Sequence, residues 1–179
     1  MFMKTINFQI SDHDTRNLEI IYCSIDINNI EKYLKRVGEV EKEQKLKISF
    51  VPNKYIYSFN HLLFSCFITE SKFLDSINVS NNFSTEMLLT ISYSDQIKNI
   101  SKELYLKEGK NKDVFVLILS EKIIAAKEQE KIKKELSIKE QEDKSIKFNI
   151  KESLLFYKVK EPNAEDKIIE KMGLSTVNK

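Results

Sequence analysis

The sequence predicts a mixed α/β fold: a single domain over residues 1–179, with a central mixed β-sheet of about five strands and helices packed on it. Two patterns predict this class, since short segments with apolar residues at every second position alternate with longer segments whose apolar residues recur every three to four positions. A length of 179 residues suits one domain. Because no apolar run approaches the roughly 20 residues that span a bilayer, we expect no membrane insertion.

The chain begins with a predicted β-hairpin. Ile6, Phe8 and Ile10 alternate with polar residues as in a first strand, and residues 18–23 form a second apolar strand. Between them, residues 11–14 (Ser-Asp-His-Asp) have the composition of a turn. Two adjacent strands with a short polar turn therefore predict an antiparallel pair.

A helix and a third strand are expected next. Asn28 or Asn29 is suited to cap a helix whose apolar stripe consists of Ile30, Tyr33, Leu34 and Val37. Gly38 either weakens the interior of this helix or ends it. Alternating Leu46, Ile48 and Phe50 then predict a strand that Pro52 closes, followed by an apolar helix containing Ile56, Phe59, Leu63, Cys66 and Phe67.

The segment from Phe83 to Leu119 predicts a strand, a helix and a strand. Period-2 alternation in Met87–Ile91 indicates a strand. Ser94 is a good N-cap for a following helix, whose apolar positions are Ile97, Ile100 and Leu104. Gly109 would end that helix, and the apolar run Val114–Leu119 indicates a central strand that is buried on both faces.

The remaining residues predict two helices. Lys122–Lys139 is dense in Lys and Glu, with a narrow stripe of Ile124, Ile132 and Leu136, which indicates an exposed helix. Residues 141–147 are polar and predict a loop. After the apolar segment Leu154–Val159, a closing helix is predicted, with a break at Pro162, Asn163 as N-cap, a stripe of Ile168, Ile169 and Met172, and Gly173 at its end.

Residues for catalysis or cofactor binding are scarce. The glycines are Gly38, Gly109 and Gly173, so no glycine-rich phosphate loop is present, and His13 and His61 are too few for a zinc site. Cys23 and Cys66 lie on apolar elements and are expected to be free core thiols. We therefore expect no metal, no cofactor, no enzyme activity, and neither tight binding nor hydrolysis of ATP by the isolated chain.

The residues from Ser84 onward resemble a known family. Ser84-Thr85-Glu86, the apolar residues Met87–Ile91, the Ile-bearing segment Ser94–Leu104 and the run Val114–Leu119 follow one another as in the small non-catalytic subunit of the KEOPS (EKC) complex, the PRPK-binding protein (TPRKB) family. The resemblance extends in order over nearly the whole chain, to the closing helix. It implies a regulatory subunit that binds the atypical kinase/ATPase subunit of KEOPS, together with the other KEOPS subunits.

The resemblance also implies a role in tRNA modification. Members of this family are thought to hold the 3′ CCA end of tRNA for the subunit that makes threonylcarbamoyladenosine. The corresponding tRNA-binding residues here are Lys72, Asn81, Asn82 and Ser84. Relatives have Lys, Arg and Thr ahead of the Ser-Thr-Glu, whereas this chain has Ser80-Asn81-Asn82, which predicts fewer phosphate contacts and a flatter salt dependence.

For kinase binding we expect the closing helix, through Ile168, Ile169 and Met172, to contribute. Since no secretory signal is visible, a cytoplasmic and nuclear location is expected. Two alternatives stay open at this point. One is a small stand-alone α/β enzyme that uses Glu86 or the Asp12-His13-Asp14 cluster, and the other is a stand-alone RNA-binding module.

Overall fold

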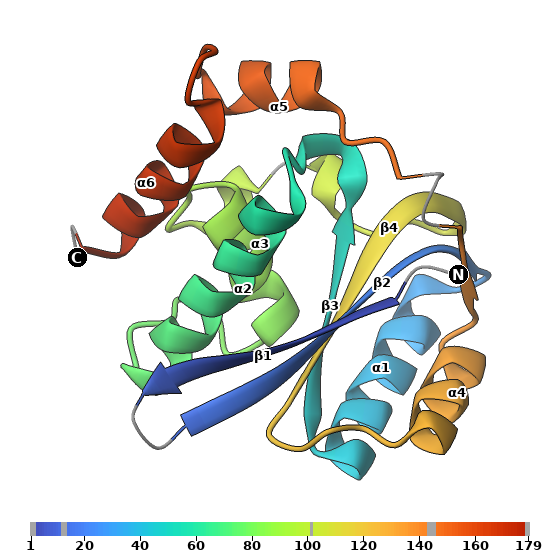
Figure 1. The fold of residues 1–179 in the computed structure, drawn as a ribbon. Coiled ribbons are helices and arrows are strands. Elements are labelled where there is room, and N and C mark those ends of the chain that lie inside the picture. Colours follow the sequence, from blue (N-terminus) through green and yellow to red (C-terminus); the bar gives the residue numbers. More distant parts are fainter. Residues whose placement is uncertain (1–2, 12–13, 101, 143–145, 178–179) are drawn as a thin grey trace. The chain divides into compact units, whose positions relative to one another are not determined.

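The computed structural model describes residues 3–11, 14–100, 102–142 and 146–177. These residues form strands β1 (Met3–Ser11), β2 (Asp14–Ile27), β3 (Leu46–Pro52), β4 (Gly109–Ser120) and β5 (Ile138–Glu140). They form helices α1 (Ile30–Gln44), α2 (Phe59–Leu74), α3 (Phe83–Ile91), α4 (Ala126–Glu135), α5 (Ile150–Tyr157) and α6 (Ala164–Val177) (Figure 1). The predicted mixed α/β class with about five strands is confirmed. The sheet itself was predicted to be mixed, and this detail is wrong, because the strand pairs of the described residues are all antiparallel.

The chain divides into two compact units. The first comprises Met1–Pro52 and Tyr105–Ile146, and the second comprises Asn53–Leu104 and Lys147–Lys179. Each unit is therefore assembled from two separate stretches of sequence. The first unit holds the sheet with α1 and α4, whereas the second is helical.

The sheet of the first unit has the order β1-β2-β4-β3, and β5 also pairs with β2. The predicted hairpin is confirmed by the antiparallel register of β1 and β2, in which Asn7 lies opposite Asn17. Residues 12 and 13 of its turn lie outside the described residues. The second strand is longer than predicted, since it continues past Cys23 to Ile27.

The central position of β4 explains its composition. The six residues from Val114 to Leu119 are all buried, with exposed fractions of 0 or 1%. A strand that pairs on both edges and is covered on both faces has no solvent-facing positions, so its sequence is a continuous apolar run instead of an alternation. The prediction for this segment is confirmed.

Helices α1 and α4 pack on one face of this sheet. Val37 and Val40 of α1 and Ile132 of α4 join one apolar cluster with β2, β3 and β4. Asn29 caps α1, because its side chain accepts a hydrogen bond from the Lys32 backbone N–H at 2.9 Å. Helix α1 runs through Gly38, and of its predicted stripe only Leu34 is solvent-exposed.

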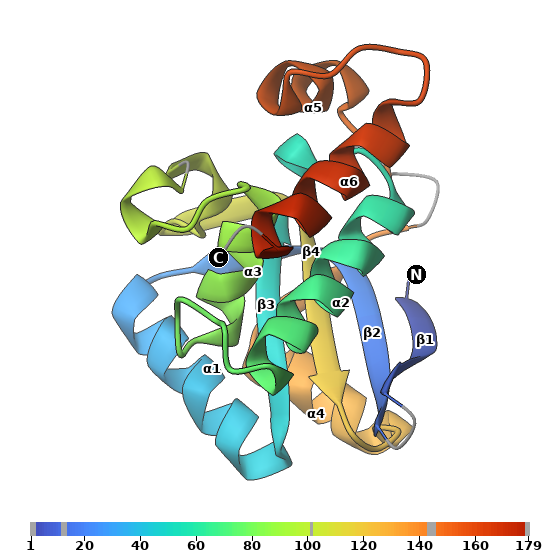
Figure 2. The same ribbon diagram turned by 90° about the vertical axis from the view of Figure 1, so that its left-hand side faces the viewer.

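The second unit is built around α2, α3 and α6 (Figure 2). Ser58 caps α2 by accepting from the His61 backbone N–H. In the middle of α2, the Ser65 hydroxyl lies 3.2 Å from the Met172 sulfur of α6. The Tyr93 hydroxyl, just after α3, donates to the Ile168 carbonyl at 2.7 Å. These contacts hold three helices together that are far apart in the sequence.

The strand predicted at Met87–Ile91 is wrong, because this segment belongs to helix α3. The Asn82 side chain accepts from the Thr85 N–H at 2.9 Å and caps the helix. Every residue from Glu86 to Ile91 is buried. A helix that is enclosed on all sides needs no polar face, so its sequence loses the 3.6-residue period and an accidental alternation remains.

The helix predicted from Ser94 to Leu104 is also wrong. The chain instead makes two short 3₁₀ turns, η2 (Ile97–Asn99) and η3 (Lys102–Leu104). The Ser94 hydroxyl closes a local turn, because it accepts from the Gln96 N–H at 3.1 Å. Serine side chains offer the backbone this alternative to a helix. Ile100 and Leu104 are buried as predicted, whereas Ile97 is exposed.

Other predicted elements shift only in their bounds. The 3₁₀ turn η1 (Asn53–Tyr55) separates β3 from α2, and the exposed helix predicted within Lys122–Lys139 is α4, followed by β5. The apolar segment Leu154–Val159 is mostly the end of α5. Cys23 and Cys66 are both buried, as expected. Of the described helices, none has the length and apolar character needed to cross a membrane.

Candidate functional site

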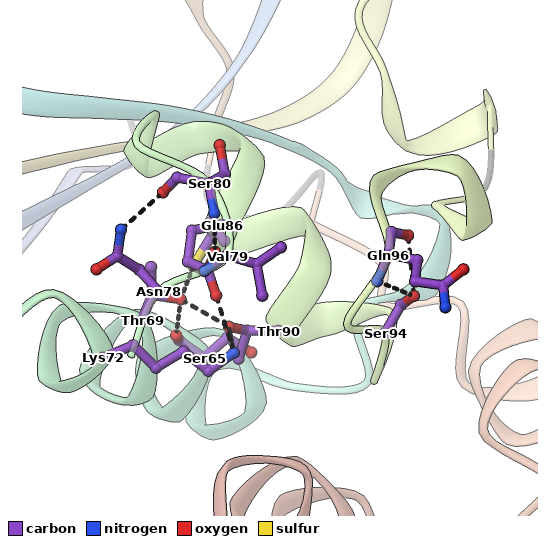
Figure 3. A network of polar contacts seen from close by, with 11 residues as sticks. Ser65, Thr69, Lys72, Asn78, Val79, Ser80, Glu86, Thr90, Ser94 and Gln96 are labelled. Carbon is purple, nitrogen blue, oxygen red and sulfur yellow. Dashed lines mark hydrogen bonds and ion pairs between the residues drawn. The ribbon is translucent and has the colours of Figure 1, made fainter. Parts of the chain in front are cut away.

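A buried ion pair joins helices α2 and α3 of the second unit. Lys72, in the last turn of α2, places its ammonium 3.1 Å from a carboxylate oxygen of Glu86, in the first turn of α3 (Figure 3). The two side chains have exposed fractions of only 4% and 0%. A charged pair this far from water is stable only if its remaining polar atoms are also bonded.

The remaining carboxylate oxygen of Glu86 is bonded by backbone N–H groups that precede α3. Its Oε1 accepts from Lys72, and its Oε2 accepts from the N–H groups of Val79 and Ser80, at 2.9 and 2.8 Å. The carboxylate is therefore bonded on both oxygens. Its position near the positive end of α3 adds a favourable interaction with the helix dipole. Glu86 therefore holds the loop 78–82 in place through the hydrogen bonds from the Val79 and Ser80 N–H groups.

Two threonines, Thr69 of α2 and Thr90 of α3, extend this network. The Lys72 ammonium also donates to the Thr90 hydroxyl at 3.1 Å, and the Thr90 and Thr69 hydroxyl oxygens are 3.1 Å apart. Thr69 in turn donates to the Ser65 carbonyl at 2.7 Å. Figure 3 shows this chain of polar groups running between the two helices. It fixes the register of α2 against α3.

The loop presents its other polar groups outward. Asn81 and Asn82 are exposed and Ser84 is half-buried, at the start of α3. The Asn82 N–H donates to the Ser80 hydroxyl at 3.1 Å, and the Asn78 side chain donates to the Ser80 carbonyl at 3.2 Å. The structure thus brings three of the four predicted tRNA-binding residues together, two in the exposed loop and Ser84 in the first turn of α3.

The fourth, Lys72, lies inside the unit. Its ammonium is held by Glu86 and Thr90, so it is not available to a phosphate group of RNA. Sequence reasoning missed the pairing of Lys72 with Glu86 because it assigned the Glu86 segment to a strand. Asn82 as an N-cap, with an acidic residue in the following turn, was the signal that favours a helix there.

The enzyme alternative named two sites, and the structure describes only one of them fully. Glu86 has no vacant oxygen facing solvent, since three donors occupy the buried carboxylate. A general base must reach its substrate within hydrogen-bond distance, and Glu86 is enclosed. Asp12 and His13 of the other cluster lie outside the described residues. Within the described parts of the chain, no cluster of three His, Cys, Asp or Glu side chains is arranged to hold a metal ion.

His61 is a buried structural histidine. Its Nδ1 accepts from the Tyr57 N–H at 3.2 Å, which leaves the proton on Nε2, 3.3 Å from the Tyr157 hydroxyl. Burial lowers the pKa of His61 from 6.5 to about 3. The imidazole therefore stays neutral in the folded protein.

This depressed pKa predicts a loss of stability in acid. Below about pH 6.5 the unfolded chain protonates His61, whereas the folded chain does so only near pH 3. The free energy of unfolding should therefore fall by up to about 1.4 kcal/mol per pH unit as the pH drops through this window, from this residue alone. Urea unfolding at about pH 7, 6, 5 and 4 should show a shallower pH dependence for His61→Gln than for the natural chain. Equal slopes would contradict the prediction.

The predicted kinase-binding residues lie mainly in the core of their own unit. Ile168 and Met172 are completely buried, in a cluster with Tyr157, Val159 and Ala164. Ile169 is partly buried against the same cluster. Of the three, therefore, Ile169 is the one that retains surface for a partner.

Comparisons with known proteins add no relative. No protein-family model matches the chain, and no curated protein matches it. The functional interpretation therefore depends on the residues themselves and on their arrangement.

Proposed function

We propose that this chain is a non-catalytic regulatory subunit of a KEOPS/EKC-type complex, which binds the atypical kinase/ATPase subunit and helps recruit the 3′ CCA end of tRNA for threonylcarbamoyladenosine modification. The proposal rests on the resemblance of residues 84–119 and their flanking elements to the TPRKB family. We place its action in the cytoplasm and nucleus. Helix α3 stands where a strand was expected, so the resemblance lies in the residues and their order.

One structural observation supports the tRNA part of the proposal. Asn81, Asn82 and Ser84 project from a turn whose backbone is fixed by the buried Glu86. A loop that is already ordered loses little conformational freedom when it binds. The Asn81 side-chain amide can donate to and accept from unpaired bases, and the Asn82 side chain, whose oxygen caps α3, can donate through its amide nitrogen. Unpaired bases at an RNA end are what proteins read by such contacts.

The test is binding of purified chain to tRNA with and without its terminal CCA, by fluorescence anisotropy. We expect tighter binding of the complete tRNA, because the unpaired end carries the contacts. Asn81→Asp with Asn82→Asp should weaken that binding roughly tenfold, since two negative charges then face the RNA backbone. Asp at position 82 still caps α3, so the fold is retained.

The control is Asn149→Asp, compared with Asn81→Asp alone so that each variant adds one negative charge. Asn149 is exposed and caps α5 in the same unit, where its side chain accepts from the Glu152 N–H. This variant should leave tRNA binding nearly unchanged. Equal binding of tRNA with and without CCA would disprove the 3′-end assignment.

The kinase part of the proposal is tested by capture of the full chain from native extract. Recovery of a kinase-like protein together with its complex supports it. Ile169→Glu is the variant to compare, because Ile169 has accessible surface while Ile168 and Met172 do not. Capture of tRNA alone would favour a stand-alone RNA-binding module instead.

A further inference from the structure

A basic groove lies beside α6 in the second unit. It runs between the segment 158–160 and α6 and has a volume of about 500 Å³. Its lining residues are Lys158, Val159, Lys160, Lys167, Glu170, Lys171 and Leu174. Four lysines against one glutamate concentrate positive charge here, on a chain whose formal net charge is only +2.

Two of these lysines donate to backbone carbonyls within residues 157–162. The Lys171 ammonium donates to the Tyr157 carbonyl at 2.8 Å, where α5 ends and its last carbonyls lack helical partners. The Lys167 ammonium lies 3.5 Å from the Pro162 carbonyl. An ammonium has three donors, so each lysine can still bond to a ligand.

Nearby carboxylates do not neutralise the groove. In the described residues, none of its four lysines forms an ion pair with a carboxylate. The neighbouring Glu161 accepts from the Tyr57 hydroxyl, and Glu165 accepts from the Ser58 hydroxyl. These acidic side chains are thus engaged with α2 and the residues before it.

The groove also has apolar surface. Of its lining residues, Val159 is buried and Leu174 is 51% exposed. None of the lining residues is aromatic. Proteins that bind single-stranded nucleic acid stack bases on aromatic side chains, and this groove offers no such platform. Lysines around an aliphatic surface suit a ligand that carries both carboxylates and an apolar side chain.

We propose that this groove binds an acidic peptide segment of a partner protein. Carboxylates of the segment would pair with Lys167 and Lys171, and an aliphatic side chain would cover Leu174. Lys158 and Lys160 would add charge at the opposite wall. The inference goes beyond the proposed function, because it depends on the groove alone and makes no use of the tRNA assignment.

The test uses a fluorescein-labelled ten-residue peptide of alternating Asp-Glu pairs and Leu, with binding to the full chain measured by anisotropy. Lys160→Glu with Lys167→Glu should weaken binding at least tenfold, because both exposed side chains then repel the peptide. Lys171→Gln gives a milder second variant, since its amide can still donate to Tyr157. Leu174→Gln should weaken the binding of the Leu-containing peptide but not the binding of an all-acidic peptide.

The matched control is Lys98→Glu with Lys151→Glu, two exposed lysines of the same unit outside the groove. This pair changes the net charge equally and should leave peptide binding within about twofold. Equal losses from both pairs, or no binding at about 1 mM peptide, would overturn the proposal. So would tighter, groove-dependent binding of a ten-nucleotide uridine RNA, which would make the groove a nucleic-acid surface.

Discussion

Replacing Lys72 by Met is expected to lower the free energy of unfolding by about 3 kcal/mol. The substitution leaves the Glu86 carboxylate, which is 0% exposed, without its cation. Breaking one side of a buried pair costs about 3–5 kcal/mol, because an uncompensated charge stays away from water. The lower end of that range applies here, since the carboxylate keeps its bonds from the Val79 and Ser80 N–H groups.

The same chain provides a matched control for this prediction. Lys54 and Glu103 form an ion pair in the same unit, at 2.8 Å, but their side chains are 37% and 47% exposed. Lys54→Met should therefore cost less than about 1 kcal/mol. Both variants are compared by urea unfolding. Equal effects would show that the burial of Lys72 and Glu86 is not what makes their contact important.

A double variant separates the pair from its surroundings. With Lys72→Met and Glu86→Gln together, both charges are removed, and the side-chain amide carbonyl that Glu86→Gln introduces can still accept from the loop backbone. The double variant should be more stable than the sum of the single effects predicts, by roughly 1.5 kcal/mol or more. Additive effects would mean that Lys72 and Glu86 stabilise the unit independently.

Ile168→Ala is expected to destabilise the chain by about 3 kcal/mol. Ile168 is completely buried among Tyr157, Ala164 and Met172, so alanine leaves a cavity that the packed neighbours fill only in part. The bond from the Tyr93 hydroxyl is made to the backbone carbonyl of residue 168 and survives the change. Because alanine also favours a helix, the loss of stability measures the lost packing and not a lower helix propensity.

Leu155→Ala is the control for this second effect. Leu155 is 70% exposed on α5, and its truncation should change the free energy of unfolding by less than about 0.5 kcal/mol. Thermal or urea unfolding of the two variants measures the difference. A free energy of unfolding for Ile168→Ala close to that of the natural chain would mean that α6 contributes little to the core.

The sequence by itself determined the elements whose signals are local. The pair Asn28 and Asn29 predicted the start of α1, and Asn29 is the cap, because a side chain that caps a helix acts on the next few residues only. Alternation predicted the first hairpin, and Pro52 predicted the end of β3, since proline lacks the N–H that continues a ladder. Val114–Leu119 was long and apolar enough to identify a central strand.

Only the tertiary structure decided what residues 83–104 become. The alternation of Met87–Ile91 resembled a strand because burial on all sides had removed the helical period. Whether Ser94 caps a helix or closes its own turn depends on the packing of Ile100 and Leu104 further along. Apart from the cap at Asn82, the patterns within this segment do not contain that information.

The candidate sites depend on contacts between distant residues, and so they also required the structure. Lys72 was predicted on the surface as a base for RNA, yet Glu86, 14 positions later, draws it into the interior. The basic groove joins residues 158–160 to Lys167 and Lys171 through the turn after α5. Composition shows how many charges a chain has, but only the fold decides which of them meet a partner within the chain and which face solvent.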